Sequence, residues 1–331
     1  MNKKLLTLAV AAAMVAPAAV MADATMYGKV RLAVESYDTA GTDYARIQNY
    51  ASRIGVKGSE DLGGGLKAVY KMEFGVDIAG SVDEFGGGNS LSNRNAYVGL
   101  AGDWGTMVLG RHDTPLKMST GKLDYFGDQA GDNGLSYTEA QTDRRANGTL
   151  AYITPNMGGL TIAAAVVPGE NTQADGLADA YSVAAMYDNS GIYASVAYEA
   201  GDTDIDALGG TTAASACADI NGTVQCQNVP STGIGDLAQM RVGLGYDGGN
   251  WRIGATWENV DLEIDDVEQG GIVGVTADVD QDHYMLNAGF DFGNNTVKAK
   301  YFEVEDSHDG FAVGLDHNFS KRTQAYLVYA N

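Results

Sequence analysis

Six basic side chains stand at alternating positions on three early segments of the chain. Within each segment the two cations are two or four positions apart, which puts both on one face of a β-strand. Two carboxylates, Asp124 and Asp128, follow in a stretch without any strand pattern. Opposite charges that face one another across a narrow aqueous gap orient dipolar solutes and discriminate between ions. These residues therefore suggest electrostatic filtering, and the six cations are Lys29, Arg31, Arg53, Lys57, Lys67 and Lys71.

Residues that could carry catalysis gather nowhere in the sequence. The four histidines (His112, His283, His308 and His317) are scattered, and neither a nucleophile elbow nor a histidine-based metal spacing occurs. The glycine triplets at 63–65 and 86–88 precede no predicted helix, so a phosphate cradle is not expected. We therefore predict no enzymatic activity, no cofactor and no catalytic or metal site.

The first 22 residues are typical of a cleaved secretory signal peptide. Lys3 and Lys4 precede an apolar stretch at 5–20, and Val20-Met21-Ala22 forms a small-x-small cleavage site. An N-terminal membrane anchor is the alternative, but Pro17 and the cleavage motif close the stretch. Beyond it the longest apolar run, 162–167, is far shorter than the ~20 residues that a membrane helix needs.

The chain is strongly acidic, with a formal net charge of −22. Removal of Lys3 and Lys4 with the signal leaves 43 acidic residues against 19 basic ones. Nucleic acid is therefore excluded as a partner, because binding phosphates requires a basic face. The acidic runs at 202–206 and 261–268 could bridge lipopolysaccharide through divalent cations. They lack the glycine placement and ligand spacing of a calcium loop, so we expect solvated surface loops.

Period-two alternation of apolar and polar residues fills the segments on both sides of the unpatterned stretch, which predicts β-strands. The turns within successive strand pairs are short, whereas the connections between pairs are long and acidic, as at 202–236, 261–281 and 303–310. This sorting by length is typical of outer-membrane barrels and is not expected of a water-soluble sandwich. The predicted strands are 24–35, 52–61, 66–74, 95–101, 106–110, 149–154, 160–167, 181–187, 192–198, 241–246, 251–257, 284–292, 296–302, 311–319 and 323–329.

The two faces of the predicted strands favour a barrel that is apolar outside. One face carries aliphatic residues with aromatic residues near the strand ends, as in 192–198 and 251–257. The other face carries Arg241, Arg252, Glu258, Lys298 and Lys300. A soluble barrel of this size would be packed with apolar side chains inside, so a polar interior indicates a water-filled channel in lipid. The predicted fold is an all-β, single-domain transmembrane antiparallel barrel over 23–331.

Fifteen strands are visible, although single-chain bacterial barrels use even numbers. An open sheet edge in lipid leaves backbone groups unpaired. We therefore expect either an overlooked strand or a missing last strand, and we favour the latter. The segment at about 112–146, called the inserted segment below, interrupts the strand rhythm. Since long unpatterned segments inside compact folds serve a purpose, we expect residues 115–143 to fold inward and narrow the barrel.

Cys217 and Cys226 are the only cysteines. The Asn221-Gly222 turn lies between them, and an exported protein meets an oxidising compartment, so a disulfide is expected. A metal-binding or redox pair is the alternative, but no histidine lies nearby.

Four motifs closely resemble the trimeric general porins of Gram-negative bacteria, and the neisserial type more than the enterobacterial one. They are Met26-Tyr27-Gly28, the stretch from Ser52 to Leu66 (SRIGVKGSEDLGGGL), the stretch from Gly105 to Arg111 (GTMVLGR), and Ser320-Lys321-Arg322-Thr323. The resemblance implies a sixteen-stranded homotrimeric barrel in the outer membrane, whose third long loop, here the inserted segment, forms a constriction. It also implies a last strand that ends in Phe, which this chain lacks, and contact with outer-membrane lipid and lipopolysaccharide.

The predicted function is passive diffusion of small hydrophilic solutes and ions through a water-filled channel. A substrate-specific channel and an adhesin or structural barrel without transport are the alternatives. The acidic composition favours cations. The six basic side chains on the first segments, called the basic stripe below, and the resemblance favour anions. Charges beyond about 8–10 Å are screened at physiological salt, so the constriction should dominate, and we expect weak anion selectivity.

Overall fold

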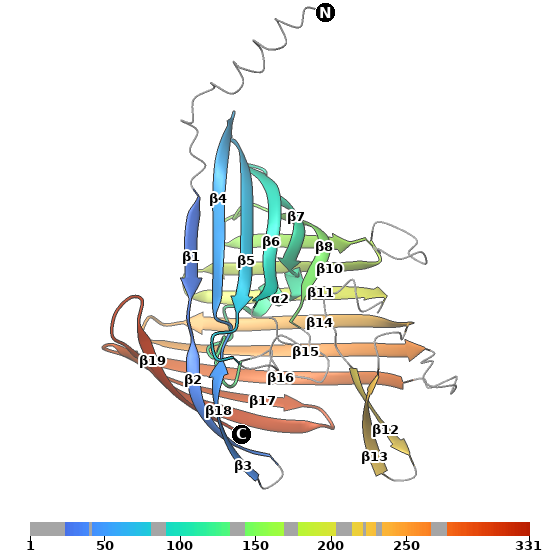
Figure 1. The fold of residues 1–331 in the computed structure, drawn as a ribbon. Coiled ribbons are helices and arrows are strands. Elements are labelled where there is room, and N and C mark those ends of the chain that lie inside the picture. Colours follow the sequence, from blue (N-terminus) through green and yellow to red (C-terminus); the bar gives the residue numbers. More distant parts are fainter. Residues whose placement is uncertain are drawn as a thin grey trace, which may run out of the picture.

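A single large antiparallel sheet makes up most of the protein. The computed structural model describes residues 24–39, 42–80, 91–132, 143–168, 178–202, 214–220, 223–229, 234–265 and 277–331. The predicted signal peptide lies outside them. Fifteen strands follow one another in the sheet, each antiparallel to the next (Figure 1). Their bounds are β1 Thr25–Lys29, β4 Arg53–Gly63, β5 Leu66–Val76, β6 Leu91–Gly102, β7 Gly105–Asp113, β8 Arg145–Ile153, β9 Leu160–Val167, β10 Ala180–Asn189, β11 Ile192–Asp202, β14 Ile234–Asp247, β15 Trp251–Asp265, β16 Ala277–Phe292, β17 Asn295–Val304, β18 His308–Asn318 and β19 Gln324–Ala330.

The fifteen predicted strands are confirmed, and two hairpins are added to them. β2 (Leu32–Thr39) pairs with β3 (Thr42–Asn49) and continues the β1–β4 pair, so the first predicted strand divides at Arg31. At this junction Tyr50 N donates to Arg31 O at 3.0 Å, and Ser52 Oγ accepts from Arg31 N at 2.9 Å. β12 (Ala214–Ile220) and β13 (Thr223–Val229) form the second hairpin, inside a connection that was predicted as a loop.

Two of the predicted long connections are wrong in length. β17 ends at Val304 and β18 begins at His308, and these two residues are paired, so the connection predicted at 303–310 is a tight turn of three residues, 305–307. β15 likewise runs to Asp265 and β16 begins at Ala277, which shortens the connection predicted at 261–281. Acidic residues of 261–281 take part in the strands, since Asp261 pairs with Asp280 and Glu263 pairs with Asp278 in the β15–β16 ladder.

The sheet has its apolar side chains outside and its polar side chains inside. On β14 the outward-facing Leu244 is 58% exposed, whereas Arg241, three residues earlier and on the inner face, is 3% exposed. Exposed aromatic residues flank the short turns, among them Trp104, Tyr246, Trp251 and Phe292, and a second set including Tyr181 and Tyr301 lies near the opposite strand ends. Two aromatic belts that border an apolar band are typical of a barrel wall in a membrane.

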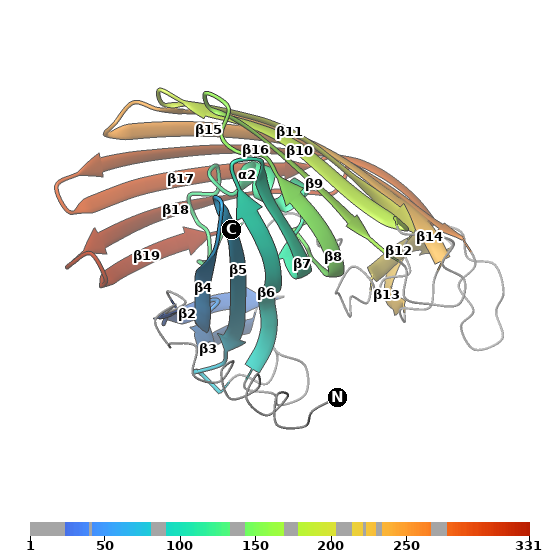
Figure 2. The same ribbon diagram turned by 90° about the horizontal axis from the view of Figure 1, so that it is seen from above.

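The sheet is bent into an arc, and the inserted segment lies on its concave side (Figure 2). Strands β1 and β19 are the two edges of the described sheet and are not paired with each other. The sixteenth strand therefore stays a prediction. The described part of the inserted segment, 112–132 and 143–146, contains the helix α2 (Pro115–Thr120), which the sequence pattern did not predict. Among the described residues no helix is long and apolar enough to cross a membrane.

Candidate pore constriction

Helix α2 begins the inserted segment and packs against the inner wall. Thr114 caps it by accepting a hydrogen bond from Lys117 N at 3.3 Å, and Pro115 occupies the first turn, where its missing N–H costs nothing. Leu116 is fully buried and its N–H donates to Ser182 Oγ on β10 at 3.0 Å. Thr114 and Ser182 thus satisfy two of the backbone N–H groups that the start of a helix leaves unpaired.

Glycines on the wall make room for the two large apolar side chains that follow α2. A Cβ at Gly243 would lie 2.7 Å from Leu123 Cδ1, and one at Gly245 would lie 2.6 Å from Leu123 Cδ2. A Cβ at Gly314 would lie 3.0 Å from Phe126 Cε1. Both side chains are buried, with Phe126 at 0% and Leu123 at 2% exposure. The concave face of the sheet is therefore complementary in shape to Leu123 and Phe126 of the inserted segment.

Arg241 on β14 ties the two ends of the inserted segment to the wall. Its guanidinium donates to Asp143 Oδ1 at 2.7 Å, Thr120 Oγ1 at 2.9 Å and Leu116 O at 3.4 Å. Those three contacts come from Nη1, whereas Nη2 donates to Glu258 Oε1 on β15 at 2.9 Å. Planar guanidinium groups suit such multidentate contacts, so Arg241 joins both ends of the segment at one buried point.

Asp128 makes the contact that the sequence predicted with the first strands. Lys29 Nζ on β1 lies 2.9 Å from Asp128 Oδ2, and Arg53 Nη2 on β4 lies 3.0 Å from the same oxygen. Arg31 Nη1 donates to Gly127 O at 2.7 Å and to Asp128 O at 2.5 Å. Burial opposes ionisation of Asp128, but the hydrogen bond from Lys29 and the charge of Arg53 outweigh it and lower the pKa of this carboxyl to about 2.

Asp124 faces a different wall from the one predicted. Its Oδ1 lies 3.7 Å from Lys300 Nζ on β17, and it also accepts from Phe126 N at 3.1 Å. The chain turns at Gly127 and Asp128, where Asp128 has a φ of 59°. The two carboxylates therefore point in different directions, a reversal that residue spacing alone could not predict.

Two of the other predicted cations contact side chains of the wall, and the third is exposed. Lys71 Nζ lies 3.4 Å from Glu73 Oε2, and Lys57 Nζ lies 5.5 Å from the centre of the Tyr27 ring. Lys67 is exposed beside the short turn that ends at Leu66. The basic stripe is therefore divided, with Lys29, Arg31 and Arg53 at the inserted segment and the rest along the wall.

Two arginines that the sequence analysis missed complete the basic wall. Arg94 Nε lies 2.7 Å from Glu73 Oε1, and Arg145 Nε lies 3.0 Å from Asp113 Oδ1. Arg145 also interacts electrostatically with Arg53, Arg94 and Glu73. Arg94 was missed because the predicted strand began at 95, and Arg145 because it was counted within the inserted segment.

Each of three carboxylates on this side of the inserted segment is shared by two cations. Asp128 contacts Lys29 and Arg53, Glu73 contacts Lys71 and Arg94, and Asp113 contacts Arg145 and Lys117, the last at 3.7 Å. Charge therefore does not cancel here. These side chains are called the basic cluster below, and they carry more positive than negative charge where the inserted segment meets the first strands. The cluster consists of the carboxylates of Glu73, Asp113 and Asp128 and the cations of Lys29, Arg53, Lys71, Arg94, Lys117 and Arg145.

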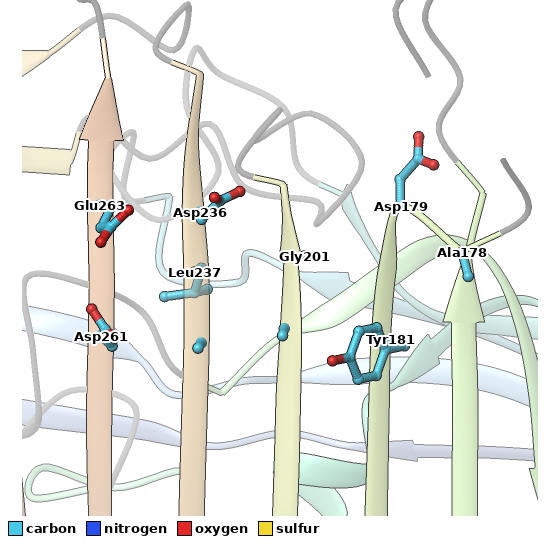
Figure 3. A pocket seen from close by; sticks show the side chains of 10 residues that line it. Ala178, Asp179, Tyr181, Gly201, Asp236, Leu237, Asp261 and Glu263 are labelled. Atoms are coloured by element: carbon cyan, nitrogen blue, oxygen red, sulfur yellow. The ribbon is translucent and has the colours of Figure 1, made fainter. Parts of the chain in front are cut away.

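An acidic cavity lies at the ends of β10, β11, β14 and β15 that are opposite the short turns β10–β11 and β14–β15 (Figure 3). It contains four of the chain's many carboxylates, those of Asp179, Asp236, Asp261 and Glu263. No group of three His, Cys, Asp or Glu side chains within the described ranges is placed to hold a metal ion. Asp261 and Glu263 of the run at 261–268 thus lie at the end of a strand, whereas 266–268 and most of the run at 202–206 lie outside the described residues.

The predicted cysteine pair falls in the β12–β13 hairpin. The backbone register places Cys217 directly opposite Cys226. Their side chains lie outside the described part of the structure, so the disulfide stays a prediction.

Comparison with known proteins agrees with this architecture. A family model described as Gram-negative porin matches residues 7–331. The major outer membrane protein P.IB of Neisseria gonorrhoeae is 28% identical, with 99% of this chain and 92% of that protein covered. The protein of the same name from Neisseria lactamica is 26% identical over the same shares.

Two solved structures share the fold. The anion-selective porin from Comamonas acidovorans superposes with a TM-score of 0.67 at 24% identity, covering 92% of this chain and 87% of that one. Salmonella typhi OmpF, in complex with daunomycin, gives a TM-score of 0.66 at 18% identity, covering 93% and 90%. Since the family model spans nearly the whole sequence, the chain belongs to the Gram-negative porins and is an outer-membrane diffusion channel, not an enzyme.

Proposed function

We propose that this porin is a homotrimer with a weak preference for anions, and that the basic cluster sets this preference. The observation that carries the proposal is the sharing of Asp128, Glu73 and Asp113 by two cations each. An excess of fixed positive charge beside a narrow aqueous path attracts anions and repels cations. The porin from Comamonas acidovorans, described as anion-selective, has the same fold.

The net charge of −22 does not oppose this proposal. Many carboxylates stand at strand ends and connections, as the acidic cavity illustrates. Salt screens charges that lie farther than about 8 Å from a permeating ion at physiological ionic strength. An ion beside the inserted segment therefore responds mainly to the basic cluster.

The test is conductance of the purified protein in planar bilayers under a salt gradient. Each inserted homotrimer should close in three equal conductance steps. The reversal potential should have the sign of anion permeation. A reversal potential of the opposite sign would refute the proposed preference, and channels that close completely in a single step would refute the trimer. Saturable block by one solute class would instead indicate a substrate-specific channel.

The low pKa of Asp128 predicts that its effect on the reversal potential is the same at pH 4 and at pH 7. A lowered carboxyl pKa adds stability above the ordinary value of 3.8, and this stability is lost as the pH falls through about 2. The contacts with Lys29 and Arg53 should therefore persist at pH 4. We expect the reversal potentials of the native protein and Asp128→Asn to differ by the same amount at pH 4 and pH 7. A difference that disappears at pH 4 would contradict the assignment.

Three further features belong to the proposal. Residues 1–22 are removed on export, so the purified protein should begin at Asp23. Cys217 and Cys226 form a disulfide, supported by their opposed positions in the hairpin, and intact mass before and after reduction should differ by two hydrogens. The apolar outer band contacts outer-membrane lipid, and the connections beyond it contact lipopolysaccharide.

A further inference from the structure

A lysine on β17 holds the turn of the inserted segment that carries Asp128. The Lys298 side chain is 2% exposed. Its Nζ donates to Tyr125 O at 3.0 Å, Gln129 Oε1 at 2.6 Å and Asp316 Oδ2 at 2.9 Å, and it lies 4.7 Å from the centre of the Phe126 ring. An ammonium group has three N–H donors, so all of its donors are used.

We propose that Lys298 is a positioning residue for the constriction, and that it sets channel width and ion preference without facing the permeation path. Three of its partners belong to the turn at 125–129, and Asp128 lies within that turn. Loss of the contact would free Asp128 to move relative to Lys29 and Arg53. This inference rests on the proposed function, because it concerns the same constriction.

The neighbouring strand is shaped around this contact. Gly314 on β18 is paired with Lys298, and a Cβ there would lie 2.9 Å from Lys298 Cε and 3.0 Å from Phe126 Cε1. Two pairs along, Ala312 is paired with Lys300, and a Cβ at Gly131 would lie 2.8 Å from the Ala312 Cβ. Small residues on β18 thus let the turn approach the wall closely enough for both lysines to reach its backbone.

A second lysine, two residues along β17 and on the same face, supports the same part of the inserted segment. Lys300 Nζ donates to Gly131 O at 2.5 Å and lies 3.7 Å from Asp124 Oδ1. Gln129 is also held directly, since its Nε2 donates to Asp316 Oδ1 at 3.4 Å. The wall side of the turn is therefore fixed by β17 and β18, while its other side meets β1 and β4.

The experiment compares Lys298→Met and Lys298→Arg with the native protein in single-channel recordings. The Lys298→Arg change keeps the charge but replaces the ammonium group with a larger, planar guanidinium at a position where Gly314 and Phe126 lie close to the side chain. We expect both variants to lose the single open level and show additional conductance levels, with a shifted reversal potential. The control Lys321→Met removes an exposed lysine in the β18–β19 turn and should keep the native open level.

If Lys298 acted as a charge in the path, Lys298→Arg would behave like the native protein and Lys298→Met would shift only the reversal potential. That pattern, or native behaviour in both variants, would overturn the inference. Gln129→Met removes one acceptor from the turn without altering a strand, and it decides the matter if Lys298→Met does not fold. Additional conductance levels in that variant support the inference, and a single native level overturns it. A native protein that fails to conduct would instead refute the proposed function.

Discussion

Simultaneous replacement of Arg53, Arg94 and Arg145 by alanine is expected to abolish anion preference. Each arginine is one of two cations on a carboxylate, so after replacement the three carboxylates are matched one for one. A unit charge at about 8 Å in water contributes roughly 0.5 kcal/mol, reduced further by salt. Three charges that favour anions and disfavour cations should together change the permeability ratio about fivefold to tenfold. The measurement is the reversal potential in a salt gradient.

A matched variant separates this local effect from the total charge. Lys67, Lys321 and Arg322 are exposed cations beside short turns, and their replacement by alanine removes the same charge. We expect that variant to keep the native reversal potential. Equal shifts in the two triple variants would mean that the overall charge of the protein, and not the basic cluster, controls selectivity. Lower salt should enlarge the shift of the cluster variant, because screening weakens.

The sequence predicted the wall of this channel well because each strand carries its own signal. Period-two alternation reports which side chains share a face, and burial of Arg241 beside exposed Leu244 is the expected outcome in a barrel with a polar interior. The positions of Lys29 and Arg53 opposite a carboxylate of the inserted segment followed from the same parity. Strand ends were less predictable, and that uncertainty excluded Arg94.

The arrangement of the inserted segment could not be derived from spacing. Asp124 and Asp128 are four residues apart, yet a backbone turn with positive φ at Asp128 sends them to different walls. One signal for its docking was present in the sequence. Gly243 and Gly245 alternate on the inner face of β14, where a strand gains nothing from glycine unless another part of the protein approaches closely. Such a pair identifies the wall that receives a segment but not the residue that fills it.

Replacement of Arg241 by methionine is expected to cause the largest loss of stability among single changes to the wall. The variant leaves Glu258, which is 2% exposed, without its guanidinium partner and releases Asp143 and Thr120 of the inserted segment. Breaking a buried ion pair from one side costs about 3–5 kcal/mol, because the remaining charge stays desolvated. The free energy of unfolding in urea, measured with the barrel in detergent or lipid, should fall by this amount.

Two comparisons identify the cause of that loss. Arg252→Met breaks the contact with Asp291, but both of those side chains are partly exposed, so its cost should stay below about 1 kcal/mol. The double variant Arg241→Met/Glu258→Gln also removes the buried carboxylate charge that Arg241→Met leaves without its partner. It should therefore be more stable than Arg241→Met alone. If the two changes were instead additive, the loss would come from packing around Arg241. The buried pair would then hold the inserted segment by its shape, and neutral side chains of the same size could replace it.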